Sequence, residues 1–204
     1  MAESKTEILN LALSHLGVGK SVANIDTEQS TEADTGSQFY DLARQTVLRD
    51  INWPFARQEM IALSLVETFD DSEEWKYSYR YPSNCLKLIR ILSGIRNDNR
   101  QSRTPYKILQ DDVGKVIYTD AESAEVEYLV DQEVVTIFPS DFVLCLSYRL
   151  AMFMAPLITA GDPFQLGARA RENYTIELSV AAKNSSNEEQ PDEEVESEFQ
   201  RGRV

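Results

Sequence analysis

The sequence contains few of the residues that most often carry chemistry. It has one histidine, His15, and two cysteines, Cys85 and Cys145. Ligands so few and so far apart do not form a zinc-site pattern, and the usual general base near neutral pH is nearly missing. Both cysteines have apolar neighbours, which favours buried free thiols and a reducing compartment. We therefore expect no enzyme activity, no cofactor and no metal.

The sequence also lacks a clear targeting or membrane segment. Its N-terminus, MAESKTEILN, has no basic start and no long apolar run, so we expect no signal peptide. The most apolar stretch, FVLCLSYRLAMFMAPLI, is interrupted by Arg149 and Pro156 and is marginal in length for a membrane span. We interpret it as a buried helix and expect no membrane partner.

Acidic residues are in clear excess. There are 34 Asp and Glu against 20 Lys and Arg, which gives a formal net charge of -14. Such a chain repels phosphates, so it is not a general nucleic-acid binder. An acidic surface suits assembly subunits and surfaces that must not hold DNA, and it also suits a soluble acidic protein of any other kind.

One short stretch, Gly19-Lys20-Ser21, matches the end of a phosphate-binding P-loop. The motif needs an earlier glycine, where this chain has Ser14, and it must open a helix after a strand. Here a capping box at residues 4–7 starts a helix and Gly17 ends it, so the loop leaves a helix instead. His15 lies on this helix with no partner in the sequence, so we place it at a surface or interface.

Three further helices follow from periodicity and capping signals. The first of them spans residues 31–51 and ends at Asn52-Trp53-Pro54-Phe55, where Trp53 and Phe55 are expected to plug the core. The next spans about 140–159, with Ser140 as its N-cap. The last runs from Pro163 to about Lys183, with Asp162 as its N-cap.

The middle of the chain has the pattern of a sheet. Period-two alternation at Tyr77, Tyr79 and Tyr81 indicates a strand with an aromatic face. Further strands are expected at residues 60–66, 86–92, 106–109, 115–120, 125–131 and 134–138. Because the turns between them are short, the sheet should be mainly antiparallel.

The chain ends in the segment SSNEEQPDEEVESEFQRGRV, which carries acids and no bases from Glu188 to Glu198. It is too polar to fold alone, so it is either a disordered tail or a segment that orders on a partner.

Outside the termini, the only basic cluster is the loop with Arg96, Arg100 and Arg103. It either contacts an acidic neighbour or is solvated.

Together these elements predict an α+β fold. Helices from both ends of the chain form a bundle, with a mainly antiparallel β-sheet domain inserted between them and an acidic C-terminal tail. The boundaries are 1–57 for the N-terminal helices, 58–139 for the β-rich domain, 140–184 for the C-terminal helices and 185–204 for the tail.

The order of these features resembles the tail tubular protein A family, the head-to-tail adaptors of short-tailed bacteriophages. The resemblance covers about residues 5–185. Its most specific pieces are the W-P-F-A run at 53–56 and the Y-x-x-P-x-x-C-L pattern at residues 79–86. These are fold markers without catalytic content, and they place Trp53, Pro54, Phe55, Pro82 and Cys85 in the core.

The resemblance implies a ring of twelve subunits in the neck of the virion, made in the host cytoplasm. The ring would join the portal protein above to the tail nozzle below, and genomic DNA would pass through its channel without specific binding. The expected portal contacts are Tyr174, Val195, Phe199, Arg201 and Arg203. Arg96, Arg100 and Arg103 are expected to contact a neighbouring subunit or the nozzle.

Two other functions stay open at this point. A neck or tail-completion subunit of a longer-tailed phage would share the helical plan and differ in its partners. A nucleotide-dependent enzyme would use Gly19-Lys20-Ser21, and binding of nucleotide with magnesium would reveal it.

Overall fold

A computed structural model describes residues 4–69, 74–95 and 102–188 of the chain. These residues form an α+β fold, as the sequence predicts. The elements in chain order are α1 Lys5–His15, α2 Thr31–Asp50, the 3-10 helix η1 Pro54–Ala56, β1 Arg57–Ala62, β2 Leu65–Thr68, β3 Tyr77–Arg80, β4 Cys85–Ile91, β5 Tyr106–Gln110, β6 Lys115–Thr119, β7 Glu125–Val130, the 3-10 helix η2 Val135–Ile137, α3 Ser140–Ile158 and α4 Leu166–Glu188.

The first two helices begin at serine caps. The Ser4 hydroxyl accepts a hydrogen bond from the Glu7 backbone N–H at 3.3 Å, and Ser30 accepts one from Ala33 at the same distance. Each bond pairs an N–H group that the first turn of a helix leaves free. Gly17 ends the first helix region with φ of +70°, a conformation that glycine adopts without strain.

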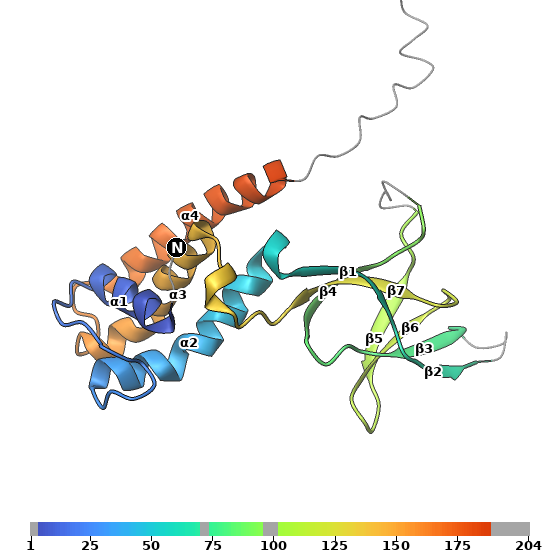
Figure 1. Ribbon diagram of the computed structural model, residues 1–204, viewed down its shortest axis with the longest axis horizontal. Coiled ribbons are helices and arrows are strands. Elements are labelled where there is room, and N and C mark those ends of the chain that lie inside the picture. Colours follow the sequence, from blue (N-terminus) through green and yellow to red (C-terminus); the bar gives the residue numbers. More distant parts are fainter. Residues whose placement is uncertain (1–3, 70–73, 96–101, 189–204) are drawn as a thin grey trace, which may run out of the picture.

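The other three helices, α1, α2 and α4, pack around α3 (Figure 1). Nine of its residues are buried, including Phe142, Leu146 and Leu150. Pro156 lies inside its last turn. Because α3 is apolar on most of its faces, it needs neighbours on all sides, and these come from both ends of the sequence.

A glycine sets the distance between α1 and α2. A Cβ atom on Gly36 would lie 2.5 Å from a methyl carbon of Leu9, which is itself fully buried. Only glycine lets the two helices approach this closely at residue 36.

The seven strands form two antiparallel sheets rather than one. The order is β1-β7-β4 in the three-stranded sheet and β2-β3-β6-β5 in the four-stranded sheet. A small core lies between them and includes Tyr79, Ile91, Ile117, Val126 and Tyr128. On the other side of the three-stranded sheet, Leu86, Ile89 and Leu129 pack into the core of the helices.

The single strand expected at 60–66 is instead a corner between the two sheets. β1 pairs with β7 and β2 pairs with β3, and the register of β1 shifts between Gln58 and Ile61. Met60, at the bulge, has φ of +56° and is 72% exposed. A bulge of this kind bends a strand, which lets one continuous segment take part in both sheets.

Three boundary predictions are wrong. The segment 134–138, expected as a strand, forms η2, whose turn directs Phe138 into the core. Ser140 is the first residue of α3 rather than its cap, because Pro139 takes the cap position. Asp162 does cap the last helix, but it accepts from the N–H groups of Leu166 and Gly167 at 2.6 and 2.9 Å, so α4 begins at Leu166 rather than Pro163.

Candidate assembly interface

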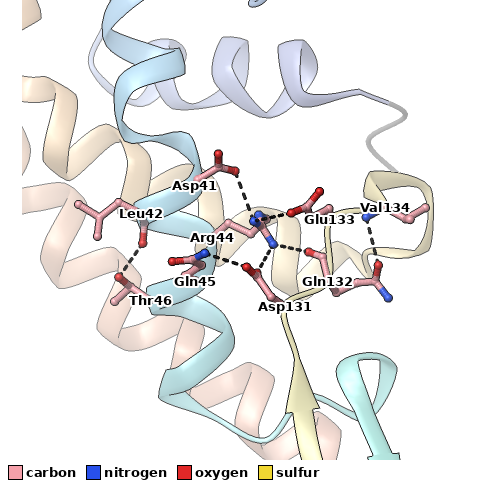
Figure 2. A network of polar contacts seen from close by, with 9 residues as sticks. All are labelled: Asp41, Leu42, Arg44, Gln45, Thr46, Asp131, Gln132, Glu133 and Val134. Atoms are coloured by element: carbon pink, nitrogen blue, oxygen red, sulfur yellow. Dashed lines mark hydrogen bonds and ion pairs between the residues drawn. The ribbon is translucent and has the colours of Figure 1, made fainter. Parts of the chain in front are cut away.

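A buried arginine joins the helices to the sheets (Figure 2). Arg44 lies on α2 and is 2% exposed. Its guanidinium pairs with Asp131, donates to the Gln132 carbonyl at 2.7 Å and lies 3.4 Å from Asp41. Gln45 donates to the second carboxylate oxygen of Asp131 at 2.7 Å. The segment that leaves β7 is therefore held against the middle of α2.

The contribution of this cluster to stability requires both the Arg44 cation and the Asp131 carboxylate. If Asp131 were replaced, the buried Arg44 cation would lose its main counter-charge. Leaving a buried charge without its partner typically costs about 3–5 kcal/mol of unfolding free energy. Arg44 was not predicted to be buried, although its position carries a signal: it follows Tyr40 by four residues and precedes Val47 by three, so it shares the apolar face of α2. A cation on that face indicates a buried partner.

A second buried charge lies in the three-stranded sheet. Glu127 on β7 is 3% exposed, and its carboxylate contacts Arg57 on one neighbouring strand and Arg90 on the other. One acid thus bridges all three strands of the sheet.

Tyr174, expected to contact the portal, is not on an outer surface. It is 4% exposed, and its hydroxyl donates to Asp50 at the end of α2. The Arg149 guanidinium lies 5.2 Å from its ring centroid. Burial, together with the hydrogen bond to Asp50, raises the pKa of this phenol. The predicted surface position of Tyr174 is therefore wrong. Its side chain is buried within the subunit, where it links α4 to α2 through Asp50 and to α3 through Arg149.

Most of the other predicted contact residues lie outside the described part of the chain. This applies to Val195, Phe199, Arg201 and Arg203, and to Arg96 and Arg100 of the basic loop. Arg103 is described and is exposed, three residues before β5. α4 continues through Glu188, beyond the predicted boundary at 184.

The predicted fold markers pack inside the subunit to different degrees. Trp53 is 1% exposed, donates to the Val47 carbonyl at 2.8 Å and meets Phe142 edge-on at 5.0 Å between ring centroids. Pro54, Phe55, Pro82 and Cys85 are half-buried. Both cysteines are free thiols, and burial raises their pKa, to about 12 for Cys145.

The P-loop-like stretch lies in the loop that leaves α1, as the capping signals predict. Lys20 forms an ion pair with Glu32 at 2.8 Å, so its ammonium group is directed at α2. His15 is not an unpartnered surface residue: its Nε2 lies 3.0 Å from Ser147 Oγ and its ring stacks on Tyr148 at 4.0 Å. Partial burial lowers the pKa of His15, which favours the neutral ring that this packing needs.

Exposed apolar side chains gather on three strands at sheet edges. β1 is one edge of the three-stranded sheet, and β2 and β5 are the two edges of the other. Two large apolar side chains on each are 37–72% exposed, namely Met60, Ile61, Leu65, Val66, Ile108 and Leu109. An exposed edge strand with apolar side chains is a template for pairing with another chain.

Two further features concern metal binding and membrane insertion. Within residues 4–69, 74–95 and 102–188, no three or more His, Cys, Asp or Glu side chains are grouped so that they could hold a metal ion. α3 is long and apolar enough to cross a membrane by length and composition, and half of that stretch is buried among the other elements. A core helix passes the same test, and α3 packs as one.

Comparison of the chain with protein-family models found no match, and comparison with curated proteins found none either.

Proposed function

We propose that this chain is a structural assembly subunit, the head-to-tail adaptor of a short-tailed phage virion. The observation that supports it best is the set of exposed apolar edges on β1, β2 and β5. Monomeric β proteins protect their edges with charge, proline or cover. Edge strands that expose pairs of large apolar side chains beside their charged ones suit a protein whose edges are covered by neighbouring copies or partners.

In this proposal the helices from both ends of the chain form one domain and the strands form an inserted domain. Twelve copies make a ring between the portal and the tail nozzle. The net charge of -14 suits a channel that DNA must pass without sticking, because an acidic wall repels phosphates. The acidic C-terminal segment and the basic loop at 96–103 add contacts to the portal or to neighbouring subunits.

A direct test is native mass spectrometry of the full chain, alone and mixed with the portal ring of the same phage. We expect about twelve copies to add to each portal ring, as the resemblance implies. A stable small oligomer that does not bind the portal would refute the adaptor role and favour a neck or tail-completion subunit with other partners.

The edge strands are tested with a matched pair of variants. Leu65→Asp places a charge on an edge, while Val113→Asp places the same charge at the tip of the β5–β6 turn, where the side chain is 82% exposed. If edges mediate assembly, the first variant loses ring-sized species and the second keeps them. Equal behaviour of the two variants would remove the edges from the assembly interface.

A further inference from the structure

The outer face of the four-stranded sheet carries a hollow of about 210 Å³ lined by Phe69, Glu74, Trp75, Lys107, Leu109 and Tyr118. The rings of Phe69 and Tyr118 stack with centroids 5.8 Å apart. Next to them, the indole N–H of Trp75 is buried and has no hydrogen-bond partner within the described residues. A buried donor without an acceptor is costly, so an incoming oxygen atom would be favoured there.

The free edge of β5 borders this hollow. At the turn beyond it, the Asp111 N–H donates to the Gly114 carbonyl at 2.9 Å. Hydrogen-bonded pairs alternate along an antiparallel ladder, so the backbone groups of 107 and 109 face β6 and those of 106, 108 and 110 face outward. Within the described residues no strand pairs with this edge. It can accept one more strand.

The charges of the chain are segregated, and this indicates what the added strand is. Residues 76–119 carry nine Lys or Arg and three Asp, although the whole chain is strongly acidic. Lys107 lines the hollow, and Arg103 is exposed just before β5. The segment from 188 to 198 carries seven acids and no base, and Phe199 follows it. Acidic residues next to one aromatic side chain complement a basic edge next to an aromatic hollow.

The length of the C-terminal segment permits contact with another copy. Sixteen residues follow the end of α4 at Glu188, and extended they reach roughly 50 Å. α4 carries the chain out of the helical part of the subunit at its C-terminal end (Figure 1). A head-to-tail contact of this kind joins unlike surfaces of successive copies, which is what closes a ring.

We infer that residues 189–204 of a neighbouring copy add as a strand to the free edge of β5 and insert Phe199 into the hollow beside Trp75. A backbone carbonyl of the added strand accepts from the Trp75 indole, and its carboxylates pair with Lys107 and Arg103. This inference rests on the proposed ring. It gives the tail a partner other than the portal, to which the family resemblance assigns it.

The test uses the full-length chain with a benzoylphenylalanine photo-cross-linker at position 199. Unlabelled and ¹⁵N-labelled copies are mixed before assembly, irradiated and digested, so that mass spectrometry separates links between copies from links within one copy. We expect links between copies, from position 199 to the peptides that contain Trp75 or Leu109.

Two variants of the acceptor hairpin make the test specific. Leu109→Glu adds a charge inside the hollow and should lower the yield of these links roughly tenfold, the effect of about 1.4 kcal/mol. Val113→Glu makes the same change at the exposed tip of the turn and should leave the yield unchanged. Circular dichroism and melting of both variants show whether each is folded. If Leu109→Glu is not, Lys107→Glu, at an exposed position, replaces it.

Links only within one copy, links only to the portal, or no links above background would each overturn the inference. Equal yields from folded Leu109→Glu and Val113→Glu would do the same. None of these results would contradict the adaptor role, because native mass spectrometry measures binding to the portal independently. Loss of portal attachment with the links between copies intact would instead refute the proposed function.

Discussion

Replacing Trp53 by alanine tests how much the indole packed between α2 and α3 contributes to the stability of the helical core. The side chain is 1% exposed, meets Phe142 edge-on and donates to the Val47 carbonyl. Truncation of a buried tryptophan costs about 3–5 kcal/mol of unfolding free energy. For a chain of this size, each kcal/mol lowers the melting temperature by about 2–4 °C, so we expect a fall of roughly 6–20 °C.

The assay is urea and thermal unfolding followed by far-ultraviolet circular dichroism, because the variant changes the tryptophan fluorescence. Trp53→Phe keeps an aromatic ring and loses the N–H donor, so part of the loss, about 1 kcal/mol, should belong to the hydrogen bond. Trp75→Ala, at a half-buried position two residues before β3, is the control and should cost less. A Trp53→Ala curve that overlays the wild type would refute the packing argument.

Three further predictions concern single groups. Arg44→Gln should lower the unfolding free energy in urea by about 1–3 kcal/mol, because the Gln132 carbonyl and Asp131 lose the hydrogen bonds that the guanidinium donates, while the partner carboxylates, 26–74% exposed, stay hydrated, and an unchanged midpoint would contradict this. Gly36→Ala forces a clash with α1 and should cost about 1–3 kcal/mol, whereas Gly19→Ala, with no atom within 4 Å of the new Cβ, should be nearly neutral in the same melts. The pKa of Asp111 is held at about 2, first by the hydrogen bond from Arg80 and then by backbone N–H groups. Because this folded pKa lies below the unfolded one, the contribution is present above about pH 4 and is lost as the pH falls towards 2. NMR titration of Arg80→Gln should show a higher pKa for Asp111.

Local signals in the sequence were enough to predict the helices and most strands. Ser4 was predicted to begin the first helix as part of a capping box, and it caps α1 in the structure. The tyrosine alternation at 77–81 predicted β3 for a physical reason: Tyr77 and Tyr79 belong to the core between the sheets. These features depend on neighbours within a few residues along the chain, so they can be predicted from the sequence pattern alone.

The errors occurred where distant contacts decide the structure. The segment 57–68 contains one apolar run, and nothing in it shows that β7 pairs with its first half and β3 with its second. The segment 134–138 is rich in β-branched residues, yet the core position of Phe138 makes it turn. Tyr174 was expected to contact the portal, but its burial against Asp50 depends on the packing of α4 on α2.

The candidate assembly surfaces were less predictable still. An edge strand differs from a central strand only in what lies beside it, so β5 could not be told from β6 by pattern alone. The basic loop was visible as a cluster of charges. The aromatic hollow could be found only from the fold, because Phe69, Leu109 and Tyr118 come from separate strands and loops.

The central position of α3 also affects how the chain is made. α1 and α2 leave the ribosome first, but the helix that buries their apolar faces comes about ninety residues later in the sequence. At about 5–20 residues per second, this interval lasts roughly 5–20 s. During that time Leu9, Leu13 and Val47 lack their final cover. The nascent chain should therefore engage cellular chaperones before α3 emerges, and the yield of folded subunit should respond to translation speed between residues 50 and 160.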